Sequence, residues 1–251
     1  MNKKLYKIIF SSFGVLLIVA VFFLVDNFPS ANAAIRVAEA EVAVPAEPVY
    51  DYSADDSLQK YLSVDTPFID LNYVPGDLLP IDSAFTANSS KAYKLREEAG
   101  IQFADMARHF RNDFKGDKLW IASAYRSNDL QEYMLKKGCS RVRCAQAGTS
   151  EHQAGLALDL KVFTKGGKGY TLYSGNRYYQ WFADNAHKRG FHNTYQKGID
   201  VDGQMVEGRH WRYMGTGLAT KLREQGQTFA EYYDELTTKS EQLTMDFDGM
   251  R

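Results

Sequence analysis

The sequence has no excess of charge of either sign and contains little cysteine. Its 30 lysine and arginine residues oppose 31 aspartate and glutamate residues, which leaves a net charge of -1, and no long basic run is present. Because binding to a phosphate backbone requires clustered positive charge, we do not expect nucleic acid as a partner. The sequence also lacks internal repeats. With 251 residues, 45% of them apolar, it is long enough to bury a core, so we expect a folded domain rather than disorder.

Cys139 and Cys144 are the only two cysteines, which is too few for a metal site built from cysteine alone. Since they lie five positions apart, we expect a local disulfide in an oxidising compartment, with two unpaired thiols as the alternative. In the chain-entropy model so short a loop contributes only about 2 kcal/mol. The expected role of the disulfide is therefore to fix the loop that leads to Ser150 and His152.

Only one long apolar run occurs, over residues 8–25, and three lysines precede it. Its 18 residues just reach the length that spans a bilayer, and the lysines favour the cytoplasmic side. We predict a membrane anchor over residues 1–33. The alternative is a cleaved signal peptide, because residues 31–33 read Ala-Asn-Ala, a small-residue cleavage pattern. Both outcomes place the rest of the chain outside the cytoplasm.

The rest of the chain divides into three parts by composition. Residues 34–65 are acidic, contain two prolines and show little apolar periodicity, which predicts an extended linker that holds the domain away from the membrane. Residues 66–236 carry the apolar patterns of a folded domain. Residues 237–251 are polar and are predicted to be a C-terminal tail that frays.

Apolar periodicity within the domain predicts a mixture of helices and short strands. Near-helical spacing predicts an amphipathic helix over residues 90–114, and further helices over 129–137 and 178–188. Residues 119–125 and 156–160 are predicted strands, and residues 203–213 a turn followed by an extended segment. Since these elements follow no regular βαβ order, the pattern indicates an α+β domain.

Two short clusters about fifty residues apart supply the donors of a zinc hydrolase site. The first runs from His152 to Asp159 and the second from Glu207 to His210. Asp159 interrupts an apolar strand, and a buried carboxylate needs a cation or strong donors. A catalytic zinc needs three ligands of the His/His/carboxylate kind and a separate carboxylate that takes the proton of its water. We predict one Zn²⁺ per chain on His152, Asp159 and His210, with Glu207 as the general base.

The remaining histidines have no comparable setting. His109 and His187 fall within predicted helices without a carboxylate at a metal-binding offset, so we interpret both as structural. His192 is expected at the surface or beside the site rather than on the substrate. The 31 tyrosine and phenylalanine residues are best explained by aromatic core packing.

Three motifs occur together in one order. They are Ser123-Ala124-Tyr125-Arg126-Ser127 with Gln131, then Ser150-x-His152-x-x-Gly155-x-Ala157-x-Asp159, then Glu207-x-x-His210-x-x-Tyr213. With them, the chain from about residue 68 to residue 222 resembles the VanY-type D-alanyl-D-alanine carboxypeptidases, zinc peptidases that trim bacterial cell-wall stem peptides. The resemblance implies a hedgehog/D,D-peptidase-like fold, in which helices flank a small central antiparallel sheet that carries the zinc site.

The resemblance also implies the substrate side of the site. Arg126 would stabilise the oxyanion or pair with the terminal carboxylate, because a guanidinium suits both tasks. Ser150 and Gln131 would bind the substrate backbone or terminus, and Tyr213 would belong to the same substrate-binding set. The chain departs from the family at Gly208-Arg209, where the family commonly has Pro-Trp, so the shape of the pocket is expected to differ there.

The expected activity is removal of the terminal D-alanine from peptidoglycan stem peptides. Two alternatives keep the fold but change the bond that is cut: an L,D-carboxypeptidase and a stem-peptide endopeptidase. A third alternative belongs to another class, a non-catalytic cell-wall-binding module. An unliganded carboxylate such as Glu207 argues against it, because a purely structural zinc site closes its fourth position.

Overall fold

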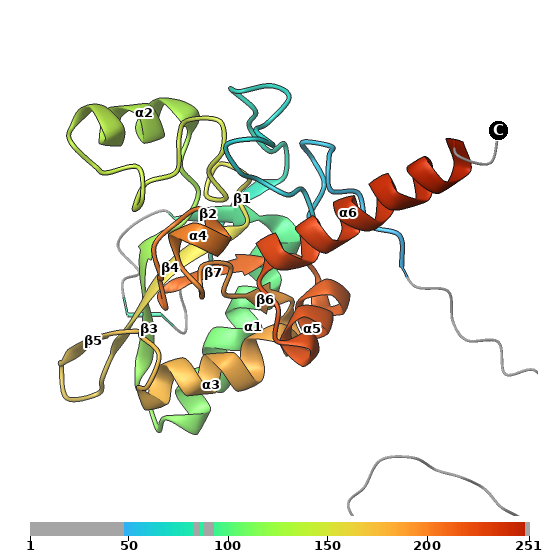
Figure 1. Cartoon of the computed structure of the whole chain (residues 1–251). Helices are drawn as coiled ribbons and strands as arrows, with labels where there is room; N and C mark the ends of the chain where they lie inside the picture. The colour runs from blue at the N-terminus through green and yellow to red at the C-terminus, as the bar shows by residue number, and fades with distance from the viewer. Residues whose placement is uncertain (1–47, 83–85, 88–92, 249–251) are drawn as a thin grey trace, which may run out of the picture. The chain divides into compact units, whose positions relative to one another are not determined.

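The computed structural model describes residues 48–82, 86–87 and 93–248. The segment predicted to be a membrane anchor lies outside the described residues. Within the described part, no helix has the length and apolar character needed to cross a membrane. The elements are, in chain order, β1 Leu78–Pro80, β2 Lys94–Arg96, α1 Glu97–Asp113, β3 Lys118–Ser123, α2 Asn128–Lys136, β4 Ala157–Phe163, β5 Gly169–Thr171, α3 Arg177–Asn185, the 3₁₀ helix η1 Ala186–Arg189, β6 Phe191–His192, α4 Ile199–Asp202, β7 His210–Tyr213, α5 Thr216–Gln225 and α6 Phe229–Asp248 (Figure 1).

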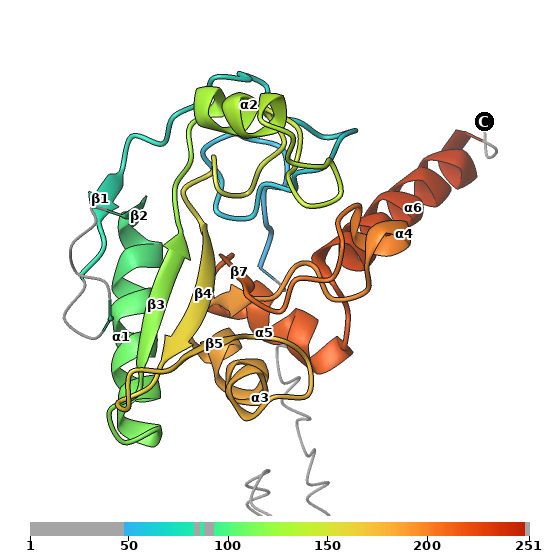
Figure 2. The same cartoon turned by 90° about the vertical axis from the view of Figure 1, so that its left-hand side faces the viewer.

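A five-stranded antiparallel sheet forms the centre of the domain. Its strand order is β3-β4-β7-β6, and β5 pairs with β4 beside β7. Helix α1 runs alongside β3 (Figure 2). Helices and an antiparallel sheet share one core without βαβ units, which confirms the α+β prediction.

The two faces of β4 have different environments because side chains alternate along a strand. Leu158, Leu160 and Val162 are fully buried in the core, which they share with aromatic residues of α1 and α3 such as Phe110 and Phe182. Asp159 alternates with them and therefore lies on the opposite face. The apolar face anchors the strand, and the other face is free to carry chemistry.

Strand β3 contains an irregularity next to this face. Ile121 pairs with Leu160, but Asp159 pairs with Ser123 rather than with Ala122, so β3 holds one extra residue at this point. A β-bulge of this kind re-aims the side chains that follow it. Here it places Ser123 beside Asp159, at the end of the strand that leads into the first sequence motif.

Helix α1 begins later than predicted. The periodicity suggested a start near residue 90, but Lys94–Arg96 form β2 and pair with β1, with Leu95 opposite Leu79. Leu95 is fully buried in that pairing. Tertiary packing therefore outweighs the helix propensity of the Lys-Leu-Arg sequence.

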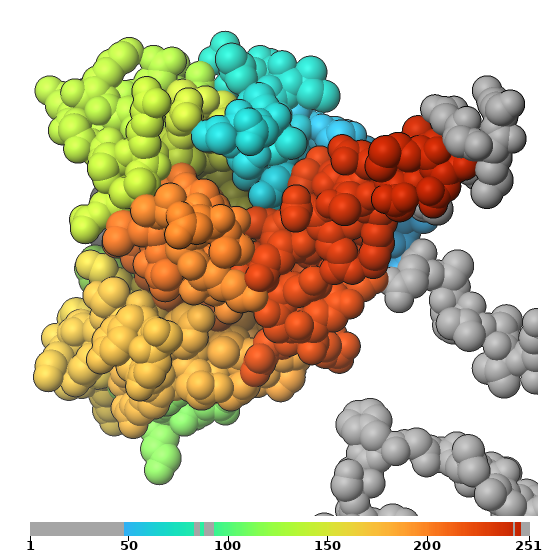
Figure 3. Space-filling model, in the orientation of Figure 1, coloured from blue at the N-terminus to red at the C-terminus, as the bar shows by residue number. Residues whose placement is uncertain are grey.

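The described part of the predicted linker is folded onto the domain. The ring of Tyr61 stacks on that of Tyr233 in α6, with centroids 4.1 Å apart, and the Tyr52 ring lies 6.2 Å from that of Phe229. Lys60 is buried and its Nζ lies 3.1 Å from Asp55 Oδ1. Figure 3 shows this segment against α6 on one face of the molecule. The acidic composition predicted an extended chain, but its tyrosines supply enough apolar surface to hold it on the domain.

Helix α6 also crosses the predicted domain boundary at residue 236. It continues to Asp248, so much of the predicted polar tail is helical. Its amino-terminal part carries Phe229 and Tyr232, which are buried in a second apolar cluster with Leu218 and Leu222 of α5.

His192 was expected at the surface or beside the site; it lies in the interior and does not line the pocket of the donor cluster, and it links the stability of the fold to pH. Burial lowers the pKa of His192 to about 4 from 6.5, and Gln196 Nε2 lies 3.1 Å from its Nε2, where it donates to the neutral ring. Between pH 6.5 and 4 the unfolded chain therefore binds a proton that the folded chain does not. The free energy of unfolding should fall as the pH drops through this window, by on the order of 3 kcal/mol from His192 alone.

Denaturant unfolding of the wild type and of His192→Gln at pH 4, 5, 6 and 7 measures this effect. The difference between the two proteins isolates His192, because the other titrating groups are common to both. Parallel pH profiles would contradict the assignment.

Candidate metal centre

Three buried side chains form a donor cluster beside the face of β4 that carries Asp159. One ligand atom from each of His152, Asp159 and His210 lies within 4.8 Å of the others. Asp159 and His210 are adjacent because they are register partners in the β4–β7 pairing. His152 comes from the turn before β4. That turn requires a glycine, since Gly155 has φ +67° and a Cβ there would lie 2.7 Å from the Leu78 side chain.

Hydrogen bonds orient both imidazoles toward the carboxylate. His152 Nδ1 lies 2.8 Å from the carbonyl oxygen of Ala124, to which it donates, so its Nε2 lone pair faces Asp159 at 3.5 Å. His210 Nε2 lies 2.7 Å from Glu151 Oε2, and its Nδ1 faces Asp159 Oδ1 at 3.4 Å. Each ring thus has one nitrogen fixed by the protein and one directed at the cluster, which is the arrangement that metal-binding histidines adopt.

The protonation states of the cluster also fit a cation. Burial and the nearby Arg126 lower the pKa of His152 to about 4. Burial opposes ionisation of Asp159, but His152 and His210 outweigh it and hold the pKa of Asp159 well below its usual value. Burial likewise disfavours a charged His210, yet its hydrogen bonds to Asp159 and Glu151 raise its pKa to about 9. A dication held by the cluster would take the place of the proton that this raised pKa favours on His210.

Glu207 lies on the loop before β7 and lines the same pocket as the donor cluster. Its backbone is fixed at both ends: its N–H donates to Tyr195 O at 3.0 Å, and its carbonyl accepts from Asn193 Nδ2 at 2.7 Å and from the N–H of His210 at 3.2 Å. Its Oε1 accepts from Arg209 Nη2 at 3.1 Å. The carboxylate is not a member of the three-residue donor cluster, as a base beside a metal requires.

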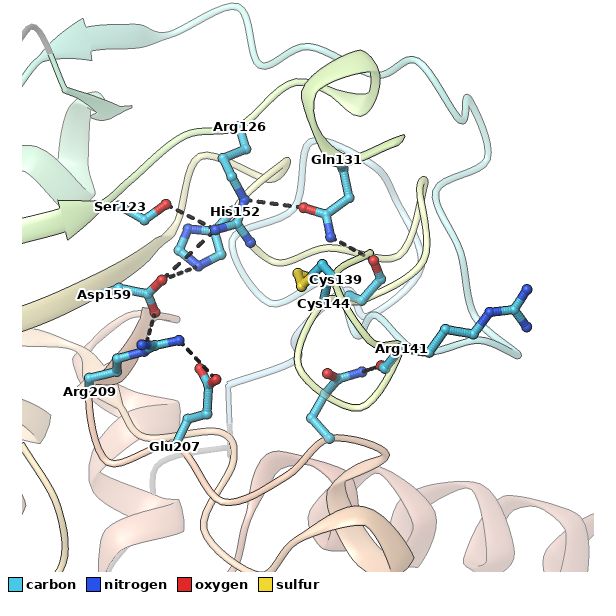
Figure 4. Close-up of a disulfide and its surroundings, with 12 residues drawn as sticks. Ser123, Arg126, Gln131, Cys139, Arg141, Cys144, His152, Asp159, Glu207 and Arg209 are labelled. Carbon is cyan, nitrogen blue, oxygen red and sulfur yellow. Dashed lines mark hydrogen bonds and ion pairs between the residues drawn. A yellow bond between two sulfur atoms is a disulfide. The ribbon is translucent and has the colours of Figure 1, made fainter. Parts of the chain in front are cut away.

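Arg126 reaches the pocket from the other side. Its Nη1 donates to Ser123 Oγ at 3.0 Å, its Nε donates to Gln131 Oε1 at 3.1 Å, and its Nη1 lies 3.8 Å from Asp159 Oδ2 (Figure 4). The β-bulge in β3 supplies the first of these contacts. The guanidinium is therefore held beside the cluster before any ligand binds.

The pocket has a volume of about 490 Å³, and Ser150, Tyr195 and Arg143 are among the other residues that line it. Cys139 and Cys144 lie in the same wall and form a disulfide with an S–S distance of 1.98 Å. The closed loop that they define leads into the segment that carries Ser150, as their spacing in the sequence predicted.

Two predicted substrate residues lie elsewhere. Gln131 is fully buried and uses both ends of its amide within the protein, because its Nε2 donates to Ala145 O at 2.6 Å while its Oε1 holds Arg126. Tyr213 does not line the pocket: it alternates with Arg212 on β7, and its hydroxyl donates to Glu98 Oε1 of α1. Strand alternation directs Tyr213 to the core face, so the structure contradicts its expected contact with the substrate.

Several pocket residues were not assigned a role from the sequence. The ring of Tyr195 stacks on that of His210 with centroids 4.6 Å apart, and Arg209 Nε lies 4.0 Å from Asp159 Oδ1. Glu151 contacts His210 directly. The one signal in the sequence for Glu151 was its charge at the x position of the Ser150-x-His152 motif. No motif in the sequence indicated a role for Tyr195.

Tight backbone packing explains why glycine, and not the expected proline, occupies position 208. A Cβ at this position would lie 2.9 Å from Leu172 O and 2.9 Å from Tyr173 Cα, both backbone atoms that cannot move aside cheaply. Close approach of the segment after β5 thus requires glycine. The next residue, Arg209, places its guanidinium between the carboxylates of Glu207 and Asp159.

Solved structures share this architecture. The LD-carboxypeptidase LdcB, whose structure is described as revealing the basis of peptidoglycan recognition, is 27% identical, with a TM-score of 0.61 over 72% of this chain and 87% of that one. A D,D-pentapeptidase VanY from a VanB-type resistance cassette, in complex with Zn(II), is 25% identical, with a TM-score of 0.54 over 69% of this chain and 97% of that one. The fold and the site therefore define the class: a hedgehog-type peptidase fold with a one-metal donor set.

Sequence comparison identifies the family. Residues 92–216 match the family model VanY, described as D-alanyl-D-alanine carboxypeptidase. YodJ of Bacillus subtilis is 30% identical over 175 residues, which cover 66% of this chain and 63% of YodJ. A D-alanyl-D-alanine carboxypeptidase of Enterococcus faecalis is 34% identical over 129 residues, which cover 45% of this chain and 46% of the relative. The chain thus spans less than two thirds of the length of both relatives, and through residues 92–216 it belongs to the VanY family.

Proposed function

We propose that this protein is a zinc-dependent carboxypeptidase that removes the terminal D-alanine from peptidoglycan stem peptides. The observation that carries the proposal is that one pocket brings together a buried His/Asp/His cluster, the separate carboxylate of Glu207 and the guanidinium of Arg126. That combination provides metal ligands, a base and an anion-binding group for amide hydrolysis.

Each residue then has a defined task. Bound zinc would supply a Lewis acid and a water of lowered pKa at His152, Asp159 and His210. The carboxylate of Glu207 takes the proton of the attacking water and returns one to the leaving amine. Because Arg209 holds Oε1 of Glu207, we assign the proton to Oε2. Arg126, fixed by Ser123 and Gln131, pairs with the substrate carboxylate or the developing oxyanion.

The relatives support the substrate class. The family model and the Enterococcus faecalis relative are both described as D-alanyl-D-alanine carboxypeptidases, and the VanY neighbour was solved with Zn(II). The similarity to LdcB favours a second candidate, an L,D-carboxypeptidase that removes D-alanine from a tetrapeptide stem. Both activities release one D-alanine but from stems of different length.

A muropeptide digest tests the proposal. We expect the purified protein to convert pentapeptide stems to tetrapeptide stems with loss of one D-alanine by mass spectrometry, and a chelator to stop the reaction until zinc is restored. Conversion of tetrapeptide to tripeptide stems would assign the L,D activity, and cleavage within the stem an endopeptidase. No product from any stem with zinc present would support a non-catalytic wall-binding module and overturn the proposal.

We also propose that the enzyme works outside the cytoplasm, tethered to the membrane by its N-terminal segment. Two observations support this location: the apolar run that follows three lysines in residues 1–25, and the disulfide between Cys139 and Cys144, a bond that persists in oxidising compartments. Peptidoglycan, the proposed substrate, lies on the same side.

A further inference from the structure

Glu151 is a buried carboxylate that lies between a proposed metal ligand and a buried arginine. Its Oε2 accepts from His210 Nε2 at 2.7 Å and from Thr194 Oγ1 at 2.8 Å, and its Oε1 accepts from Arg212 Nη1 at 2.9 Å. Glu151 is 3% exposed and Arg212 is fully buried. Solvent therefore screens neither charge, and each depends on the other for compensation.

The contact with His210 determines which nitrogen faces the metal cluster. Because Glu151 accepts the Nε2 proton, the lone pair for a metal must come from Nδ1, which points at Asp159. A carboxylate in this position fixes the tautomer and the ring orientation and makes the imidazole a stronger ligand. Glu151 itself lies outside the three-residue donor cluster.

Arg212 extends this network to segments outside the family-matched residues 92–216. Its Nη2 donates to the carbonyl oxygens of Leu58, at 3.4 Å, and Lys60. Its guanidinium carbon lies 5.0 Å from the centroid of the Phe229 ring in α6. One segment before the matched region and one after it thus hold the same guanidinium.

Side chains of residues 58–61 keep those carbonyl groups in place. Gln59 Nε2 donates to Met214 O at 2.9 Å, just after β7. The Tyr61 ring stacks on that of Tyr233 and meets the Phe229 ring edge-on at 5.2 Å. None of these four side chains lines the metal pocket.

We infer that Glu151 is a positioning residue for the metal ligand His210, and that the packing of residues 58–61 against α6 sets the metal affinity of the site through Arg212. The inference rests on the proposed metal site and adds to it a dependence on segments that the family match does not cover. It follows that substitutions in residues 58–61, which reach the ligand His210 only through Arg212 and Glu151, should alter metal binding.

Glu151→Gln tests the first half. Glutamine keeps the volume of the side chain but removes the charge and presents an amide to Arg212, so we expect zinc affinity to fall roughly 10–100-fold, the usual effect of losing such a partner. Affinity is measured by competition with a chromophoric chelator on the full chain at pH 7. Glu132→Gln, which changes an exposed carboxylate paired with Lys136, is the matched control. A purely packing role predicts wild-type affinity, and that result would overturn the inference.

Tyr61→Ala tests the second half, because it loosens residues 58–61 without touching a ligand or Glu151. We expect weaker zinc binding here too, within the same order as for Glu151→Gln. Phe110→Leu, a core change on α1, controls for a general loss of stability and should leave zinc affinity unchanged. Unchanged affinity in Tyr61→Ala, with Glu151→Gln impaired, would refute the role of the segment.

Two further outcomes are informative. A wild-type chain that binds no zinc would count against the proposed function, whereas tight zinc binding by both the wild type and Glu151→Gln refutes only the positioning role. If Glu151→Gln does not fold, Thr194→Val removes one donor to Glu151 and keeps the rest of the network. It should then lower zinc affinity by a smaller factor, and an unchanged value would overturn the inference.

Discussion

Replacement of Glu207 by glutamine is expected to lower kcat by about 10²–10⁴-fold, the range that general acid–base catalysis contributes, while zinc stays bound. Glutamine has the same size as glutamate and still offers an oxygen to Arg209, but it cannot take a proton from water. The three metal ligands are untouched by the change. Initial rates on the stem peptide identified by the digest, together with zinc content by elemental analysis, measure both effects.

The surface change Glu132→Gln provides the control, since it alters a carboxylate of the same type outside the pocket. A Glu207→Gln enzyme with near-normal kcat would show that another group accepts the proton. Loss of zinc together with activity would instead indicate that Glu207 helps to hold the metal.

Replacement of His210 by alanine is expected to remove both the metal and the activity. Two donors would remain in the cluster, and Glu151 would lose the partner that its Oε2 contacts at 2.7 Å. The metal affinity should fall by more than the 10–100-fold that is typical when a residue that only supports a ligand is lost. Metal analysis after dialysis against a zinc buffer measures the outcome.

His109→Ala is the matched control, because His109 lies partly exposed on α1 and contacts Asp105 rather than the pocket. It should retain one zinc per chain. One-to-one zinc in His210→Ala would remove this residue from the ligand set.

Local sequence patterns predicted much of the site because metal chemistry restricts which residue types suffice. Asp159 interrupts an apolar strand, and that contradiction within the local pattern pointed to a cation. His152 and His210 followed from the need for two more donors. The structure brings these three residues together, and it places Glu207 and Arg126 in the same pocket.

Local sequence patterns could not predict contacts between residues that are far apart in the chain. Arg212 and Leu58 are 154 positions apart, and neither residue carries a local signal of the other. The acidic composition of residues 34–65 likewise predicted an extended linker, although tyrosines in the second half of this segment pack against α6. Tyr213 was misplaced for a related reason: the motif gave its position in the chain, but the strand register gave its direction.

The register between β4 and β7 also has a consequence for the order of folding. His152 and Asp159 are seven positions apart, whereas Asp159 and His210 are separated by 51. The third ligand joins only when the chain has closed that loop and paired the two strands, a step that non-local topology makes slow. A metal ion therefore finds a complete donor set only late in folding, so its main kinetic effect should be to slow unfolding rather than to speed folding.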